Sequence, residues 1–239
     1  MDTKNLPIMV CYPAGAGGSF LGSALHCIFN NAPIIISKTG HCHLTTAESV
    51  PHYVPTSDIV GIKNELTALE SIKLPIANQS ILKGHVRNLI AMQSLCYDLW
   101  FIKITFDQSN PNELEFLHRM LDAKMPMRER LISCYDQIKP GYWPDRLEDF
   151  LILPECYNLF KQQNLDTLTN WFWVENQSTK SRTIELSLQD LFLGVPGNKL
   201  SQWFDKEVID KLFDLVKNYQ NINKSLYPDT IALLEHTNT

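Results

Sequence analysis

Several features that define whole classes of protein are missing from this 239-residue chain. No uninterrupted apolar run approaches the length of about 18 residues that a membrane-spanning helix needs. The first five residues lack the charged-then-apolar layout of a secretory signal. None of the six cysteines forms a CxxC pair, and we expect no disulfide framework in so long a chain without such a signal. The sequence therefore predicts a cytoplasmic protein that makes no contact with a membrane.

A basic surplus is also missing. The chain has 21 basic and 26 acidic residues and a formal net charge of -5. A protein that coats nucleic acid normally carries excess positive charge, so we expect no nucleic-acid partner. A small anionic ligand needs only a local cluster of donors and stays possible. With 44% hydrophobic residues and no internal repeat, the chain suits one domain over residues 1–239.

The clearest positive signal is a loop with almost no side chains near the N-terminus. Residues 6–12 form a short apolar run typical of a buried strand, and residues 20–29 have apolar positions at helical spacing. Between them lie Gly15, Gly17 and Gly18, followed by Ser19. Glycines let backbone N–H groups converge on an anion at a helix N-terminus, which favours phosphate binding. The alternative is a tight turn that only joins a strand to a helix.

This loop lacks the pattern of a standard ATPase. A Walker motif has Gly, four residues, then Gly-Lys-Ser/Thr. If Ser19 is the final residue of that motif, Gly18 replaces the lysine and Tyr12 replaces the first glycine. An NTPase without this lysine loses its main contact to the β- and γ-phosphates. The sequence therefore predicts a phosphate loop with a different use.

The rest of the chain alternates apolar strand-like runs with helical patterns. We expect strands at 80–86, 99–106 and 183–188, a short strand or extended segment at 33–37, a polar loop at 38–58, a turn region at 191–198, and helices at 62–69, 89–96, 111–121, 128–138 and 205–222. Such alternation predicts an α/β fold with a mostly parallel sheet and helices on both faces. Ligands of these sheets bind at the carboxyl ends of the strands, here near residues 13–19, 83–87 and 107–110.

Lys83 and His85 lie at the end of one predicted strand. Side chains two residues apart on a strand point the same way, so both can face the glycine loop. A lysine can stabilise charge on a transferred group while a neutral histidine removes a proton from an acceptor. The alternative is a charged strand end exposed to solvent.

At this point the chain resembles a known family, the P-loop sulfotransferases, which use 3′-phosphoadenosine 5′-phosphosulfate (PAPS). Their first strand ends in P-K-S-G-T-T-W-L, and residues 17–21 are similar to its G-T-T-W-L part, with Phe20 for Trp. A later family strand reads I-I-K-T-H-L-P, which residues 81–86 resemble, with Lys83 and His85 in matching places. Residues 183–192 also resemble the strand and E-D-L segment of the family.

The resemblance implies roles for particular residues. His85 would be the catalytic base, and Lys83 would contact the transferred sulfonate. The loop lysine of the family falls on Gly15, and no arginine stands at residues 107–110, where the family has R-N-P-R-D. Ser109 and Arg119 are then the candidates to hold the 3′-phosphate. The residues expected to bind the donor along the loop are Gly15, Ala16, Gly17, Gly18, Ser19 and Phe20.

Two further segments have chemically suggestive compositions. His41, Cys42, His43 and His52 could ligate a metal, but zinc sites have paired spacings that this segment lacks, so we expect a polar loop and no metal. Residues 171–173, Trp-Phe-Trp, have no interleaved basic residues and suit a core or the wall of an acceptor pocket.

Together these patterns predict an α/β P-loop fold of sulfotransferase type, with three layers and a helical insert at residues 125–174 over the acceptor site. The leading function is transfer of a sulfonate group from PAPS to a hydroxyl or amine of a small-molecule or glycan acceptor, without a metal. One alternative is a small-molecule kinase, for which Asp107 is the tempting Mg²⁺ ligand. The other is a non-catalytic protein that binds a nucleotide or a partner on the same fold.

Overall fold

The computed structural model describes residues 7–31, 34–36, 42–44, 52–53, 81–95, 99–124, 162, 166 and 168–236. The helices expected at 62–69 and 128–138 and most of the expected insert at 125–174 lie outside these residues. The elements in chain order are β1 (Ile8–Cys11), α1 (Gly18–Phe29), β2 (Ile34–Ile36), β3 (Cys42–Leu44), β4 (His52–Tyr53), β5 (Ile81–Gly84), α3 (Leu89–Leu95), β6 (Trp100–Thr105), α4 (Pro111–Lys124), α8 (Gln177–Lys180), β7 (Thr183–Ser187), α9 (Leu188–Phe192), α10 (Gly197–Leu200), α11 (Lys206–Leu226) and α12 (Pro228–Glu235).

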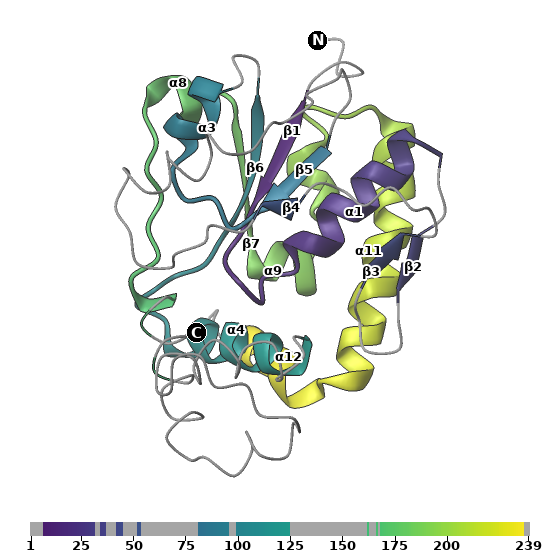
Figure 1. The fold of residues 1–239 in the computed structure, drawn as a ribbon. Coiled ribbons are helices and arrows are strands. Elements are labelled where there is room, and N and C mark those ends of the chain that lie inside the picture. The colour runs from purple at the N-terminus through teal and green to yellow at the C-terminus, as the bar shows by residue number, and fades with distance from the viewer. Residues whose placement is uncertain are drawn as a thin grey trace, which may run out of the picture.

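The centre of the fold is a five-stranded sheet in the order β4-β5-β1-β6-β7, and every pairing in it is parallel. All four residues of β1 are buried, because helices cover both faces of a parallel sheet and continuous apolar runs suit such strands. Strands β5, β6 and β7 confirm the predictions at 80–86, 99–106 and 183–188. The α/β class with a parallel sheet and flanking helices is therefore confirmed (Figure 1).

Of two predictions about the segment after α1, the short strand is confirmed and the polar loop needs correction. The run at 33–37 does contain a strand, β2, but it pairs with β3 in a separate two-stranded antiparallel sheet. The segment 38–58, expected to be a polar loop, contributes both β3 and β4. Short strands of two or three residues give little periodic signal in a polar context, so the sequence pattern missed them.

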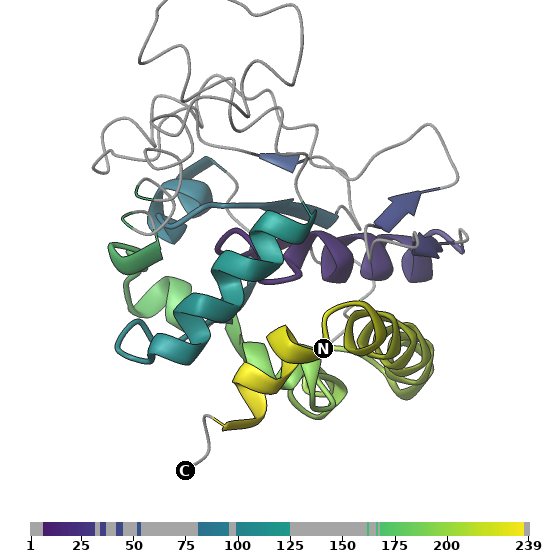
Figure 2. The same ribbon diagram turned by 90° about the horizontal axis from the view of Figure 1, so that it is seen from below.

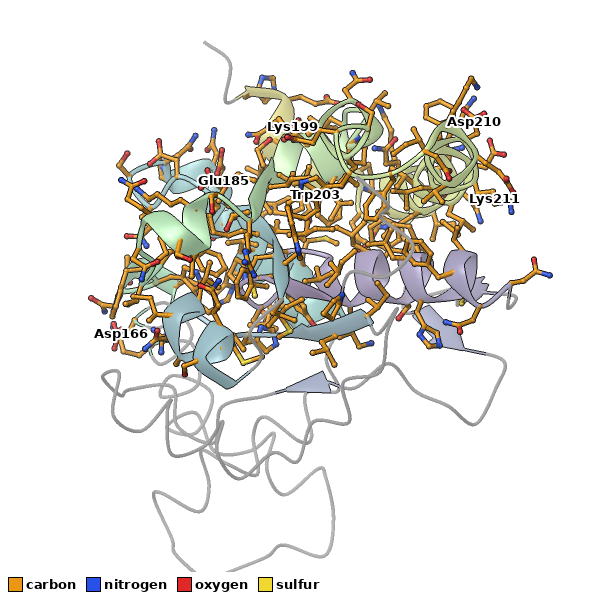
Figure 3. The ribbon with its side chains drawn as sticks, turned by 90° about the horizontal axis from the view of Figure 1, so that it is seen from above. Asp166, Glu185, Lys199, Trp203, Asp210 and Lys211 are labelled. Carbon is orange, nitrogen blue, oxygen red and sulfur yellow. The ribbon has the colours of Figure 1, made fainter. Side chains whose placement is uncertain are left out.

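Helices cover the sheet in two layers (Figure 2). Helices α1, α4, α9, α11 and α12 pack on one face around a large apolar core, and α3 packs on the other face around a smaller one. Trp203 packs edge-on against Trp100 of β6, with 4.9 Å between ring centroids, and lies inward of α11 in Figure 3. Asp210 and Lys211 lie on the outer side of α11 in the same view.

Local sequence chemistry explains where α4 begins. The side chain of Asn110 accepts the N–H of Asn112, as expected of a helix cap, and Pro111 occupies the first helical position. Glu113 lies at the position from which a side chain can complete a capping pair with Asn110. Instead, its Oε2 accepts the N–H of Asp107 at 2.7 Å and its Oε1 accepts from Gln189 at 2.8 Å. Glu113 therefore connects the end of β6 to α9 through two hydrogen bonds.

The C-terminal helices differ from expectation in detail. The helix predicted at 205–222 is confirmed as α11, which begins after its cap Asp205 and runs four residues further than the expected end. Phe213, within this helix, is 41% exposed. The turn region expected at 191–198 contains parts of α9 and α10, and no prediction covered α12. The capping box of Ser187 and Asp190, which starts α9, was the available signal for one of these helices.

Candidate functional site

The sheet order makes the ends of β1 and β6 the place where the chain connections leave the sheet in opposite directions. The connection after β1 runs through α1 toward the β5 side, whereas the connection after β6 leads through α4 toward β7 (Figure 1). Ligands of open parallel sheets bind where the connections diverge in this way. The glycine loop and the turn at 107–110 are the two segments at this point. The sequence prediction places the candidate site at this same edge of the sheet.

The loop between β1 and α1 makes a sharp turn with two left-handed residues. Gly15 has φ +86° and Gly17 has φ +77°, conformations that glycine adopts without strain. The N–H of Ala16 donates to Pro13 O at 3.1 Å, and the N–H of Phe20 donates to Gly17 O at 3.0 Å. Gly18 and Ser19 start α1, where helix N–H groups have no partner within the helix and can donate to an anion.

Packing also requires these glycines. A Cβ on Gly15 would overlap the main-chain oxygen of Leu117 in α4, and a Cβ on Gly17 would lie 2.9 Å from Leu191 Cδ2 and 3.1 Å from Tyr219 Oη. The loop is therefore pressed against α4, α9 and α11. The tight-turn interpretation and the anion-binding interpretation both fit, and a bulky residue at position 17 would disturb the fold as well as any ligand.

Tyr12 is the side chain that sequence reasoning did not place in the site. Its buried ring lies where a side chain on Gly18 would stand, since a Cβ built there overlaps that ring. Its Oη lies 2.7 Å from Ser19 Oγ. Burial raises the pKa of the Tyr12 hydroxyl above its usual range, so this group stays neutral. The available signal was its position at the missing first glycine of the Walker pattern.

His85 is joined directly to this loop. Its Nδ1 lies 2.9 Å from the main-chain oxygen of Tyr12, and its ring packs edge-on against the Tyr12 ring with 4.7 Å between centroids. A carbonyl oxygen only accepts, so Nδ1 must carry the proton. In the neutral imidazole the lone pair is then on Nε2, which is the form that a general base requires.

Lys83 lies on the α1 face of the sheet but is held away from the loop. Its Nζ donates to Ser23 Oγ at 3.3 Å, and its stem passes over Gly22, where a Cβ would lie 3.1 Å from the Cβ of Lys83. Ser23 is five residues beyond Gly18, or about 7.5 Å along the helix axis at 1.5 Å per residue. The lysine and the glycine loop therefore share α1 without meeting in this conformation.

The candidates for the 3′-phosphate are not brought together. Ser109 is exposed, and both its N–H and its hydroxyl bond Asp107 Oδ1, at 2.8 and 2.6 Å. Those hydrogen bonds lower the pKa of Asp107. Arg119 donates to Glu115 Oε1 at 2.7 Å on the exposed side of α4. It lies nine residues past Asn110, about 13 Å along the axis, so the two residues do not converge on one group.

Two of the expected donor contacts are core residues. Ala16 is fully buried, and Phe20 is 2% exposed and stacks on Tyr219 with 3.9 Å between centroids. Among loop residues 15 to 20, only Ser19 is exposed to solvent. The sequence did not indicate that Ser23 contacts Lys83 or that Tyr219 lies against Gly17, because isolated polar residues within helices give no specific signal.

The segment 171–173 runs extended beside the end of β5. Val174 forms a parallel bridge with Asn88, and the Arg87 guanidinium lies over the ring of Trp171, 5.3 Å from its centroid. Phe172 is 54% exposed, whereas Trp171 is buried. Arg87, which contacts Trp171, lies two residues after His85 in the sequence, and the burial of Trp171 agrees with the predicted core position.

A metal centre finds no support in the part of the chain that the structure describes. Within those residues, no group of three or more His, Cys, Asp or Glu side chains is suitably placed for a metal ion. His43 and His52 belong to different sheets, and His41 lies outside the described residues.

Among the described helices, none is long and apolar enough to cross a membrane.

Comparison with known proteins adds no family to this geometry. No protein-family model matches the chain, and no curated protein and no solved structure matches it significantly. The chemistry of the site therefore carries the functional argument.

Proposed function

We propose that this chain is a P-loop sulfotransferase-like enzyme that moves a sulfonate group from PAPS to a hydroxyl or amine. The observation that carries the proposal is the hydrogen bond from His85 Nδ1 to the loop carbonyl of Tyr12. It connects a base in the required tautomer to a glycine loop at a helix N-terminus. Both elements stand where an α/β sheet binds its ligands.

In this mechanism the N–H groups of Gly18 and Ser19 hold the 5′-phosphosulfate end of the donor. His85 Nε2 takes the proton from the acceptor hydroxyl as that oxygen bonds to sulfur. The bond between sulfur and the bridging phosphate oxygen breaks, and adenosine 3′,5′-bisphosphate leaves with the electron pair. Lys83 would stabilise the charge on the moving group if its ammonium leaves Ser23, a rotation that its flexible four-carbon stem permits.

A second function is favoured by one observation. The Lys83 ammonium donates to Ser23, a residue about 7.5 Å along α1 from Gly18, so in this conformation it bonds the helix beyond the loop. A protein that binds a nucleotide or an anion without turning it over needs no lysine at the loop. The kinase alternative gains less, because Asp107 already accepts two hydrogen bonds from Ser109.

A thermal-shift comparison separates these functions, because a ligand that binds only the folded state raises the melting temperature. The probes are adenosine 3′,5′-bisphosphate and ATP with Mg²⁺, each at several concentrations. A shift with the bisphosphate alone supports sulfonate transfer, and slow hydrolysis of PAPS then distinguishes an enzyme from a binding protein. A shift with ATP–Mg²⁺ alone supports the kinase, and the absence of both shifts contradicts the proposal.

A further inference from the structure

The positions of the first glycine and of the lysine in the Walker pattern lie in contact in this fold. Position 12 would be the first glycine, and position 18 would be the lysine. A Cβ on Gly18 would overlap the Tyr12 ring, so a lysine stem cannot start from this residue while the tyrosine is present. The two departures from the motif are therefore one steric exchange, in which a ring from the strand end fills the space of the missing side chain.

The same tyrosine engages the third element of the motif. In a Walker loop the Ser/Thr hydroxyl coordinates Mg²⁺. Here the hydroxyl of Ser19 lies 2.7 Å from Tyr12 Oη, so it is already in a hydrogen bond with a protein group. A tyrosine hydroxyl is neutral or, when ionised, negative, so Tyr12 cannot replace the positive charge of the ammonium, and burial keeps it neutral. The Tyr12 side chain thus fills the space of a side chain at the lysine position and forms a hydrogen bond with the hydroxyl that would bind the metal.

We propose that Tyr12 is the specificity-determining residue of the loop, excluding Mg²⁺–nucleoside triphosphates and leaving a site for a phosphate or sulfonate group bound without metal. This inference deepens the proposed function and rests on the loop binding such a group. A triphosphate with Mg²⁺ needs the lysine to balance phosphate charge and a free serine hydroxyl to coordinate the metal. Neither is present while Tyr12 holds its position, so the loop selects anions that main-chain N–H groups alone can neutralise.

Two substitutions test the inference directly. Tyr12→Gly together with Gly18→Lys turns residues 12–19 into Gly-Pro-Ala-Gly-Ala-Gly-Lys-Ser, a complete Walker motif. We expect ATP–Mg²⁺ to raise the melting temperature of this double variant and to bind it at least about tenfold more tightly than the wild type, by calorimetry with EDTA as the metal-free control. A wild-type protein that binds ATP–Mg²⁺ equally well overturns the inference, as does a folded double variant that gains nothing.

A mutant cycle tests the steric part without any ligand. Gly18→Ala should lower the melting temperature of the wild type, because the new methyl meets the Tyr12 ring, and should lower it far less in the Tyr12→Gly background. Equal effects in both backgrounds contradict the contact. Wild-type protein also provides a measurement that needs no variant: its shift with adenosine 3′,5′-bisphosphate or inorganic sulfate should be the same in Mg²⁺ and in EDTA. A Mg²⁺-dependent shift overturns the inference.

The outcomes separate this inference from sulfonate transfer. If the wild type responds to sulfate or phosphate but not to adenosine 3′,5′-bisphosphate, the sulfotransferase proposal fails while the role of Tyr12 stands. If the bisphosphate binds and PAPS is turned over, yet the folded double variant refuses ATP–Mg²⁺, the reverse holds.

Discussion

Lys83 and Ser23 face each other across the junction of β5 and α1, with Nζ 3.3 Å from Oγ. The hydrogen bond holds the ammonium against the side of α1. The lysine stem packs over Gly22, where a side chain would crowd it. Any role of Lys83 in group transfer therefore requires this bond to open when the donor binds.

We expect Lys83→Ala to weaken the sulfonated donor more than the desulfonated product, because Lys83 would touch only the transferred group. A charge-assisted hydrogen bond contributes about 1.5–3 kcal/mol, which is roughly ten- to a hundredfold in affinity. Calorimetry with PAPS and adenosine 3′,5′-bisphosphate measures both. Ser23→Ala, which removes the hydroxyl that accepts from Lys83, should leave PAPS affinity unchanged or tighter. Identical losses for both ligands in Lys83→Ala would show that the lysine only supports α1.

His85→Ala should lower turnover by about 10²–10⁴-fold with nearly unchanged donor affinity, since a general base acts on the acceptor. PAPS hydrolysis is the assay until an acceptor is found. The base must be neutral, so wild-type turnover should fall as acid protonates the imidazole. His236→Ala, at the C-terminal end of α12, is the matched control. A folded, fully active His85→Ala protein would remove the catalytic assignment.

Arg119→Ala should weaken adenosine 3′,5′-bisphosphate more than adenosine 5′-phosphate if Arg119 holds the extra phosphate. The folded protein itself should change little, because an exposed pair such as Arg119–Glu115 contributes about 0–1 kcal/mol to stability. Lys206→Ala removes a comparable exposed pair with Asp210 and serves as the control. Equal losses for the two nucleotides would identify Arg119 as a solvated helix charge.

Lys103→Met should destabilise the protein strongly. Lys103 is 3% exposed and pairs with Glu175 at 3.2 Å and with Glu185, and it lies 5.4 Å from the centroid of the Trp173 ring. Removing it leaves the largely covered Glu175 carboxylate, 12% exposed, uncompensated, which costs up to about 3–5 kcal/mol. Urea unfolding measures the loss. Glu185→Gln, at the exposed partner, should cost far less, and equal costs would contradict this account.

Asp190→Asn should destabilise the protein at neutral pH and much less in acid. Burial alone raises the pKa of Asp190, but hydrogen bonds from Lys199 and Ser187 outweigh it and lower the pKa overall. A carboxyl whose folded pKa is depressed stabilises the fold above its unfolded pKa of about 3.9, and the contribution disappears as pH falls through the folded value. Urea midpoints of both proteins between pH 7 and pH 3 should therefore converge, whereas a constant gap would exclude this linkage.

Continuous apolar runs predicted the interior of the fold well. β1, β5, β6 and β7 were found because residues such as Ile102 and Leu186 recur in a pattern that suits a buried sheet. β3 and β4 escaped because short polar strands carry no period. The contact between His85 and the glycine loop agrees with the expectation, from the alternation of side chains along a strand, that His85 faces this loop.

The missed parts of the site depend on contacts that sequence spacing does not encode. Tyr12 covers Gly18, six residues away, only because the loop folds back on the strand end. The bond from Lys83 to Ser23 joins residues separated by 60 positions. Glu113 bonds Asp107 rather than its capping partner Asn110 because the turn before α4 brings that N–H within reach.

The central place of β1 has a consequence for the order in which the chain can fold. Ile8 pairs with Ile81 on one side and with Trp100 on the other, so both neighbours of the first strand are made long after it. Closing such long loops costs entropy before any contact returns it, and parallel sheets of this kind fold slowly. During synthesis on the ribosome, an apolar strand followed by an apolar helix must wait for residues up to Thr105. The newborn chain is therefore expected to depend on chaperones that shield its N-terminal segment until the sheet can close.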